Sequence, residues 1–360
     1  MILPCTSRDE ISLESNNQVD IMNTMSFGNI HTIAVLGDGG WGTTLAIHLT
    51  RKNYQVKLWG AFPHYVREVQ KKRINPRFLP GINIPKQIDM VDRLEVALSN
   101  AQLLILAVPS QYIHGILKEL KPFDLSNTIV LSVIKGIDPV SLKRMSELIV
   151  GELGKVKLAV LSGPTIARET AQGLPTTAVV ASRDSQVAHA LQMVFNSEKF
   201  RIYTNSDVVG VELGGSIKNV IAIACGVCDG LGFGTNAKAA IVTRGLAEMT
   251  RLGRALGAKS KTFSGLTGLG DLVTTCFSPQ SRNRFVGEQL GKGIRIDQIT
   301  QKMDMVAEGV ETVKAVHRLS QKFRIVLPIT NEVFQIIYKK KDPRQAVNDL
   351  MNRRVTTEFY

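Results

Sequence analysis

Short apolar runs alternate with stretches of helical periodicity from residue 30 onward. Residues 30–36 form a short run rich in β-branched side chains, and apolar residues then recur every three or four positions over 42–52, as in an amphipathic helix. The same spacing predicts a helix over 185–195, "SQVAHALQMVF". Further strands are predicted at 55–59, 103–108, 128–133, 157–161, 176–182 and 200–205. Strands that alternate with helices predict a mostly parallel sheet with helices on both faces.

The pattern changes after Asp207. The β-branched strands stop, and one helix after another is predicted to the C-terminus, with glycine-rich breaks at 230–234, 265–270 and 291–293. A chain of 360 residues exceeds the roughly 100 to 200 residues of a single domain, so we expect two domains. The predicted parts are a flexible extension, an α/β domain, an all-helical domain and a C-terminal tail, at residues 1–29, 30–207, 208–345 and 346–360.

A glycine motif lies between the first predicted strand and the first predicted helix. Gly37, Gly39 and Gly42 have the spacing GxGxxG within "AVLGDGGWGTTLA", residues 34–46. The first glycine permits a tight turn, the second lets a pyrophosphate approach the backbone, and the third lets the helix pack closely on the strand. The helix N-terminus then offers unpaired N–H groups to the anion. In this context the motif predicts a Rossmann-type domain that binds NAD or NADP.

The adenosine end of this site lacks one usual part. Domains that bind NAD commonly carry Asp or Glu about 20 residues after the glycines, where the carboxylate binds the ribose 2′-hydroxyl. No acidic residue occurs between Gly42 and Glu68. We therefore expect NADP to be tolerated as well as NAD. The cations available for a 2′-phosphate are Arg51, Lys52, His64 and Arg67; the alternative is that they only face water.

Net charge and hydropathy bear on the partners of the chain. The formal charge of +13 suggests nucleic acid as a partner, but the basic residues are dispersed. The densest basic runs, 71–73 and 339–341, are not interleaved with aromatic residues. We expect no nucleic-acid partner. Apolar runs such as 103–108 and 220–228 are shorter than the ~18 residues that cross a bilayer, so we also expect no membrane span.

Cysteine usage and the N-terminus favour a cytoplasmic protein. Four cysteines in 360 residues make no disulfide framework, and residues 1–29 lack the basic and apolar regions of a secretory signal. Cys225 and Cys228 form a CxxC in an uncharged stretch, with no second CxxC nearby. This favours buried thiols over a zinc site, so we predict no metal.

Two lysines occupy positions suited to chemistry. Lys135 in "VIKG" follows a predicted strand, as does "LSGPT" at 161–165, and ligands of α/β sheets bind beyond such strand ends. Lys135 is thus a candidate cation for an anionic substrate. Lys218 shares a helix face with Gly214 and Gly215, which indicates that another element approaches closely there. Either Lys218 extends out of a crowded helix end, or burial lowers its pKa toward the range of proton transfer.

The segment "GLGDLVTTCFSPQSRNRF", residues 268–285, brings further polar groups into one loop-rich region. Asp271 is the natural partner to orient Lys218 or balance its charge. Arg282, with neighbouring amides such as Asn283, can form a forked clamp for a phosphate. The alternative for Arg282 is an ordinary surface charge.

Seven motifs follow one another along about residues 31–345: GxGxWGT, VIKG, LSGPT, ELGGSIKNVIAI, GLGDLVTTC, SRNR and VAEGVET. In these motifs the chain resembles the NAD(P)-dependent glycerol-3-phosphate dehydrogenases, in particular the bacterial soluble form. The resemblance implies an oxidoreductase that interconverts dihydroxyacetone phosphate and sn-glycerol 3-phosphate, the precursor of glycerophospholipids, and it implies a homodimer. Ala61 stands where the family often has a basic residue.

The resemblance also implies roles for individual residues. Lys218 would be the proton donor and acceptor, oriented by Asp271, with Lys135 beside them in the catalytic group. The residues implied to surround the substrate are Lys135, Gly163, Thr165, Lys218, Asp271, Thr275, Ser281, Arg282 and Asn283. Those implied to contact the cofactor are Gly37, Gly39, Gly40, Trp41, Gly42, Lys135, Ala167, Arg282, Val306 and Glu308.

Two other functions fit parts of the sequence. A 2- or 3-hydroxyacid dehydrogenase of the same architecture also uses a lysine on a helix after the sheet domain, but residues 281–283, "SRN", favour a phosphate over a bare carboxylate. A cofactor-sensing regulator without catalysis has no need for Lys218 on a small apolar helix face.

Overall fold

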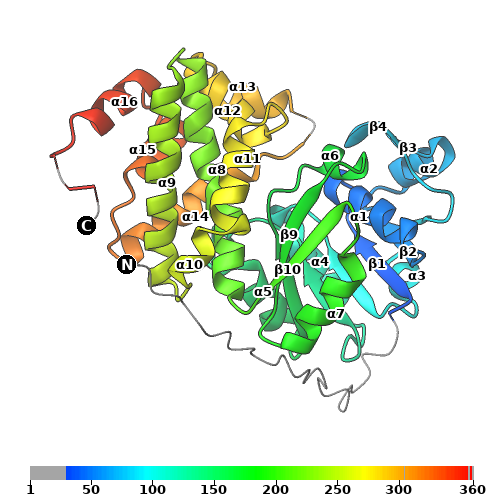
Figure 1. Cartoon of the computed structure of the whole chain (residues 1–360). Coiled ribbons are helices and arrows are strands. Elements are labelled where there is room, and N and C mark those ends of the chain that lie inside the picture. The colour runs from blue at the N-terminus through cyan, green and yellow to red at the C-terminus, as the bar shows by residue number, and fades with distance from the viewer. Residues whose placement is uncertain (1–29, 304, 356, 359–360) are drawn as a thin grey trace, which may run out of the picture.

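The computed structural model describes residues 30–303, 305–355 and 357–358. A sheet flanked by helices makes up one half of the molecule, and a group of helices makes up the other (Figure 1). The chain passes from one half to the other between the last strand, which ends at Asn205, and a long helix that begins at Val208. The predicted extension at 1–29 lies outside the described residues.

The strands of the sheet half lie close to their predicted positions, except the short strand Asp89–Val91, which the pattern did not predict. They are β1 Thr32–Leu36, β2 Gln55–Trp59, β5 Asp89–Val91, β6 Leu103–Leu106, β7 Ile129–Ser132, β8 Lys157–Ser162, β9 Thr176–Ala181 and β10 Phe200–Asn205. Two more strands, β3 Ile74–Asn75 and β4 Leu79–Asn83, form a separate antiparallel pair that periodicity did not predict.

Helices connect these strands. They are α1 Gly40–Arg51, α2 Pro63–Lys72, α3 Leu94–Leu98, the 3₁₀ turn η1 Ser110–Tyr112, α4 Ile113–Leu120, α5 Met145–Leu153, α6 Ala167–Ala171 and α7 Ser185–Phe195. The predicted helix over 185–195 matches α7 to the residue, and Asp184 caps it by accepting bonds from the next backbone N–H groups.

The sheet has the order β10-β9-β8-β7-β6-β1-β2-β5. Neighbouring strands are parallel except β8 and β9, which are antiparallel, so the prediction of a mostly parallel sheet is confirmed. β9 and β10 are parallel to each other and antiparallel to the rest of the sheet. β2 lies on one side of β1 and β6 lies on the other, so the strand order changes direction between β1 and β6. Ligands of open α/β sheets bind at such a change of direction.

Both faces of the sheet are buried. On β1, Ile33 and Val35 face a core that includes residues of α1 and α7, whereas Ala34 and Leu36 face a second core with residues of α4 and α5. The two cores explain why the strands are uninterrupted apolar runs without polar alternation.

The second half is helical throughout its described residues, as predicted. Its elements are α8 Val208–Gly230, α9 Thr235–Ala255, α10 Ser260–Phe263, the π-helix η2 Leu266–Gly270, α11 Asp271–Phe277, α12 Arg282–Gly291, α13 Ile296–Gln301, α14 Glu308–Lys322, α15 Pro328–Lys339 and α16 Pro343–Met351. The expected C-terminal tail at 346–360 begins inside α16, because Asp342 caps this helix and Ala346 is buried in the helical core. That predicted boundary is wrong.

Helix α8 is the centre of the helical half (Figure 1). It packs against α9, α11, α12 and α14 and also against β8 of the sheet. By length and composition α8 would be able to cross a membrane, but 89% of its most apolar window is buried inside the protein. It is therefore a core helix, and Cys225 and Cys228 are buried thiols within it, as predicted.

Candidate active site

The glycine loop connects β1 to α1 at the β1–β6 junction. Gly37 has φ of +120°, and a Cβ there would lie 2.7 Å from the carbonyl oxygen of Ala107, which follows β6. A Cβ at Gly42 would lie 1.9 Å from the oxygen of Gly37. Gly39 differs from both, because the space around it is open. The outer glycines let the strand, loop and helix pack closely, and the middle one leaves the backbone accessible.

The start of α1 suits an anion. Gly39 is its N-cap and supplies no side-chain cap, and no acidic residue lies in the first turn. The first N–H groups of a helix without a cap are available to a pyrophosphate, which the helix dipole also favours. The residues present therefore fit a dinucleotide.

Two more expected cofactor residues lie beside this helix start. A Cβ at Gly40 would meet the oxygen of Phe78 at 2.5 Å and the side chain of Ala167 at 3.8 Å. Thr44 of α1 also donates to the carbonyl oxygen of Ala167, at 3.0 Å. Trp41 packs its ring edge-to-face against Phe200, with centroids 6.3 Å apart.

Two of the four cations expected for a 2′-phosphate lie at the wrong end of α1. Arg51 donates to the carbonyl oxygen of Ala171, and Lys52 donates to those of Met193, Val194 and Asn196. These contacts place both side chains at the C-terminus of α1, one helix length from the glycine loop. The expectation for Arg51 and Lys52 is wrong. Both residues come just before β2 in sequence, so they lie near the start of this strand and not near its carboxyl end, where the adenosine is expected.

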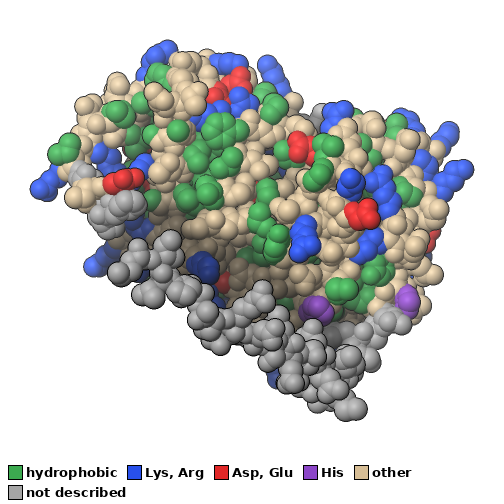
Figure 2. Space-filling view, in the orientation of Figure 1, with side chains coloured by type: hydrophobic (Ala, Val, Ile, Leu, Met, Phe, Trp, Pro, Cys, Tyr) green, Lys and Arg blue, Asp and Glu red, His purple; other side chains and the backbone are tan. Residues whose placement is uncertain are grey.

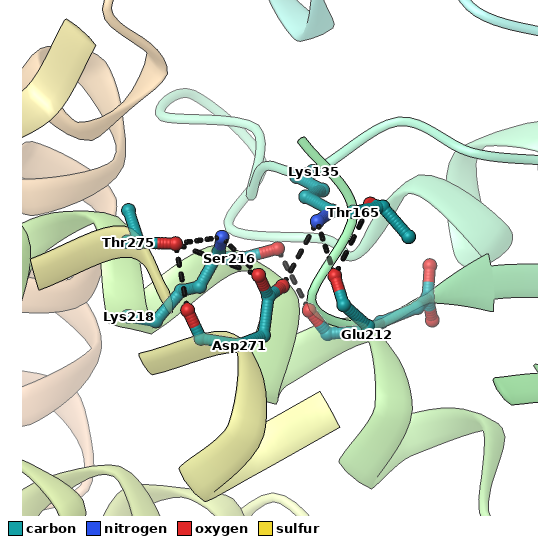
Figure 3. A network of polar contacts seen from close by, with 8 residues as sticks. Lys135, Thr165, Glu212, Ser216, Lys218, Asp271 and Thr275 are labelled. Carbon is teal, nitrogen blue, oxygen red and sulfur yellow. Dashed lines mark hydrogen bonds and ion pairs between the residues drawn. The ribbon is translucent and has the colours of Figure 1, made fainter. Parts of the chain in front are cut away.

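A carboxylate between two lysines forms the centre of the second group of expected residues (Figure 3). Lys218 Nζ lies 2.6 Å from Asp271 Oδ1, and Lys135 Nζ lies 2.8 Å from Asp271 Oδ2. Lys218 also donates to Thr275 Oγ1 at 2.5 Å, and Lys135 to the carbonyl oxygen of Gly163 at 3.2 Å. Charge-assisted bonds of this kind fix both ammonium groups in direction.

Four separate elements supply this network. Lys135 lies in the loop after β7, Gly163 in the loop after β8, Lys218 in the middle of α8, and Asp271 at the first position of α11. Thr165 Oγ1 donates to the oxygen of Gly163 and continues the network in Figure 3. The loops at strand ends and the helical half thus meet at one place.

Glycines bring α8 close enough for this meeting. A Cβ at Gly214 would lie 2.5 Å from the backbone oxygen of Thr267 in η2, and a Cβ at Gly215 would lie 2.4 Å from Ser162 Oγ at the end of β8. The predicted close approach to this glycine pair is confirmed. Glu212 lies one turn before Gly215 on α8 and joins this helix to α5. Its carboxylate accepts bonds from Ser146 N and Ser146 Oγ and pairs with Arg144.

Lys218 is nearly fully buried, with 5% of its surface exposed. Burial lowers its pKa to about 8, since an ammonium loses hydration there. The carboxylate of Asp271 raises this pKa, and the charge of Lys135 lowers it. The result is an amine that exchanges its proton near neutral pH, as general acid–base chemistry requires.

The segment after α11 contributes the remaining expected residues. Ser281 caps α12 by accepting a bond from Arg284 N, and buried Asn283 accepts a bond from Gly309 N at 2.9 Å. Arg282 is exposed, and in the part of the chain that the structure describes no hydrogen bond joins it to the Lys218 network.

Electrostatic contact nevertheless joins Arg282 to the site through Glu308. Burial raises the pKa of Glu308, while the positive charges of Arg282, Lys135 and Lys218 lower it. Glu308 is therefore within electrostatic range of all three cations. Val306 is half-buried and lies two residues before Glu308, the first residue of α14.

The comparisons with known proteins agree along both halves of the chain. The profile described as "NAD-dependent glycerol-3-phosphate dehydrogenase N-terminus" matches residues 32–188, and the corresponding C-terminus profile matches 207–348. This chain belongs to the NAD-dependent glycerol-3-phosphate dehydrogenase family. A family member named glycerol-3-phosphate dehydrogenase [NAD(P)+], from Chlorobium phaeobacteroides, is 46% identical over 330 residues, which cover 91% of this chain and 99% of that protein.

Solved structures place the chain in the glycerol-3-phosphate dehydrogenase family as well. The crystal structure of the enzyme from Coxiella burnetii has a TM-score of 0.87 and 41% identity, and the match covers 90% of this chain and 99% of that one. A D-mandelate dehydrogenase structure shares the fold alone, with a TM-score of 0.59 and 13% identity. The resemblance found in the sequence is therefore confirmed at the family level.

Sequence reasoning missed a residue that supports the glycine loop. Asn75 is fully buried and donates to the backbone oxygen of Asp38 at 2.7 Å and to Thr43 Oγ1 at 2.9 Å. It lies in the short pair β3–β4, which carries no clear periodicity. A buried asparagine of this kind is recognised only when its partners are known.

Proposed function

We propose that this chain catalyses reversible hydride transfer between NAD(P)H and dihydroxyacetone phosphate, giving sn-glycerol 3-phosphate. The observation that carries the proposal is buried Lys218, held by Asp271 and Thr275 at the strand ends, in a chain of the glycerol-3-phosphate dehydrogenase family. The relatives named glycerol-3-phosphate dehydrogenase [NAD(P)+] support both the reaction and the use of NAD or NADP. The product is the backbone precursor of glycerophospholipids.

Lys218 is the proposed proton donor for reduction and acceptor for oxidation. The nicotinamide ring supplies or accepts the hydride at C2 of the substrate when the cofactor is bound. Lys218 then moves the proton at the oxygen on the same carbon, because its ammonium titrates near neutral pH. Asp271 orients this ammonium, and Lys135 is a second cation beside it.

The phosphate of the substrate is assigned to Arg282. This side chain is exposed but shares the region around Glu308 with Lys135 and Lys218, so it can hold a dianion without entering the lysine network. Binding energy from the phosphate then positions the reacting carbonyl. The other residues proposed to line the substrate are Gly163, Thr165, Thr275, Ser281 and Asn283.

The cofactor is assigned to the glycine loop and the residues around it. The pyrophosphate would lie on the N-terminus of α1, whose N-cap residue supplies no side-chain hydrogen bond. The residues proposed to contact the cofactor are Gly37, Gly39, Gly40, Trp41, Gly42, Lys135, Ala167, Arg282, Val306 and Glu308. We further assign cofactor binding to residues 30–207 and most substrate contacts to the helical half from 208 onward.

A homodimer in the cytoplasm is the proposed form of the protein. Leu269, Val273 and Phe277 recur every four residues and are 40%, 41% and 44% exposed. Apolar side chains gather over this part of the helical half in Figure 2, while Lys and Arg are dispersed over the face shown. An apolar stripe of this kind supports association between copies. Sedimentation or light scattering of the purified chain would measure its mass in solution.

One assay tests the reaction and the cofactor together. Oxidation of NADH and of NADPH is followed spectrophotometrically with dihydroxyacetone phosphate, beside pyruvate and a 3-oxoacid. We expect turnover with dihydroxyacetone phosphate that exceeds the others by orders of magnitude. Faster reduction of an oxoacid would instead support the hydroxyacid dehydrogenase alternative, and cofactor binding without any turnover would support a sensor.

A further inference from the structure

Asp38 is a buried carboxylate inside the glycine loop. It lies between Gly37 and Gly39, with 8% of its surface exposed. Its Oδ2 is buried, and among the described residues no group donates a hydrogen bond to this atom. Burial raises the pKa of Asp38 to about 6, although its own backbone N–H lowers it. A carboxylate that is buried without a partner destabilises the protein, so its position calls for a reason.

The carboxylate of Asp38 lies beside Gly60, the first residue after β2. A Cβ built on Gly60 would be 2.4 Å from Asp38 Oδ2, so the carboxylate occupies the space of a side chain at position 60. The backbone places Gly60 firmly at the sheet end, because its N–H donates to the oxygen of Val91. The end of β2 is where dinucleotide-binding domains present an acidic side chain to the adenosine ribose. In this chain Asp38 brings a carboxylate to that place from the loop that follows the neighbouring strand, β1.

Hydrogen bonds to its backbone hold Asp38 in this position. Its carbonyl oxygen accepts from Asn75 Nδ2 at 2.7 Å and from Thr43 Oγ1 at 3.1 Å. Asn75 is in turn fixed by Tyr65, whose hydroxyl donates to Asn75 Oδ1 at 2.6 Å. Thr43, Tyr65 and Asn75 come from α1, α2 and β3, so the two direct partners of Asp38 and the residue that fixes Asn75 belong to three different elements. These bonds fix the backbone from which the carboxylate projects toward the end of β2.

We propose that Asp38 accepts a hydrogen bond from the 2′-hydroxyl of the adenosine ribose and thereby makes the chain prefer NADH to NADPH. A 2′-phosphate would meet the carboxylate at close range, which costs affinity. The expectation from the sequence that NADP is tolerated rested on the missing acidic residue between Gly42 and Glu68. The inference rests on the dinucleotide site of the proposed function but not on its substrate.

The test compares three nucleotides on three forms of the protein. Dissociation constants are measured by fluorescence titration, without substrate, for NADH, NADPH and NADH with a 2′-deoxyadenosine. The proteins are the wild type, Asp38→Asn, which keeps the shape, and Asp38→Ser, which removes the carboxyl group. For the wild type we expect NADH to bind about tenfold or more tighter than either other nucleotide, since a bond to a charged group is lost. In Asp38→Ser, NADH and the deoxy form should bind within about twofold of each other. In Asp38→Asn the amide oxygen still accepts a bond but carries no charge, so NADPH should bind within about twofold of NADH.

Glu68→Gln is the matched control. Glu68 is another carboxylate near this end of the sheet, on α2, where it pairs with Lys72 at 2.6 Å. Its removal changes the net charge equally but leaves Asp38 in place, so the preference for NADH should persist. The thermal melting of each variant shows whether it is folded, and Asp38→Asn by itself suffices if Asp38→Ser does not fold.

Three results would overturn the inference. Equal wild-type affinity for NADH and its 2′-deoxy form, equal wild-type affinity for NADH and NADPH, or unchanged discrimination in the Asp38 variants would each show that the carboxylate does not contact the ribose. In these cases the dinucleotide still binds, and the proposed reaction stands. Loss of all nucleotide binding in the wild type would overturn the proposed function as well, so the two failures are distinguishable.

Discussion

Lys218 Nζ lies 2.6 Å from Asp271 Oδ1, and the two residues belong to different helices, 53 positions apart in sequence. The other oxygen of the same carboxylate contacts Lys135, so one negative charge is shared by two ammonium groups. The cluster is thus left with an excess of positive charge. With burial, this arrangement gives Lys218 a pKa of about 8, so its ammonium form can donate a proton and its amine form can accept one.

Replacing Lys218 by alanine should abolish most turnover. One general acid or base typically contributes about 10²-fold or more, so we expect kcat to fall by at least that factor. The dissociation constant of NADH should change little, because the glycine loop is untouched. Steady-state kinetics and NADH titration measure the two effects. Lys292→Ala, which removes an exposed lysine paired with Glu288, is the control and should be fully active. Normal turnover of Lys218→Ala would remove this residue from the mechanism.

The pH dependence should follow the titration of Lys218. Reduction needs the ammonium, whose pKa is about 8 before the substrate binds, so kcat/KM for dihydroxyacetone phosphate should fall as pH rises through about 8. Oxidation of sn-glycerol 3-phosphate needs the neutral amine and should rise over the same range. Rates measured from pH 6 to 10 with a saturating cofactor check both signs. Two profiles that move in the same direction would contradict the assignment.

Replacing Asp271 by asparagine should shift that pH profile. The carboxylate raises the pKa of Lys218, and the amide keeps the shape but loses the charge. We therefore expect the fall of kcat/KM for dihydroxyacetone phosphate to begin at a lower pH than in the wild type, together with a lower maximum. An unchanged midpoint with a lower maximum would show that Asp271 acts on folding or geometry alone.

Replacing Arg282 by alanine should mainly weaken substrate binding. Loss of a charge-assisted bond to a phosphate costs about tenfold or more, so KM for dihydroxyacetone phosphate should rise accordingly, with a smaller change in kcat. Arg295→Ala, at an exposed pair with Asp297, provides the control. The clamp is refuted if KM stays at the wild-type value.

Asp38→Asn should stabilise the free protein at neutral pH. The pKa of Asp38 is about 6 in the folded protein, against an ordinary value of 3.8. Between these two pH values the folded state binds more protons than the unfolded state does. The free energy of unfolding of the wild type therefore falls as pH rises from 4 to 6. Above pH 6 the carboxylate is ionised in the folded protein as well, and its burial lowers the free energy of unfolding by on the order of 3 kcal/mol at most. Urea unfolding should show a gain for the variant at pH 7.5 and little gain at pH 4. A gain of equal size at both values would exclude ionisation as the cause.

Local pattern was sufficient for most of the elements. The strands at 55–59 and 200–205 and the helix at 185–195 lie at the predicted residues, because periodicity reports directly which side chains are buried. The glycine loop was also predictable, since a tight turn and the start of a helix depend on residues adjacent in sequence. The short strands β3 and β4 were not, because two to five residues carry too little pattern.

The neighbours of each functional side chain were decided by the tertiary structure. The sequence by itself determined that Lys218 lies on a small apolar helix face and that a glycine loop follows β1. Only the order of the strands and the packing of α8 decided that Lys135 and Lys218 share Asp271, that Arg51 and Lys52 lie far from the loop, and that Asp38 reaches the end of β2. The physical reason is that periodicity records burial along one element, whereas these contacts join elements whose separation in space is set by the sheet and the core.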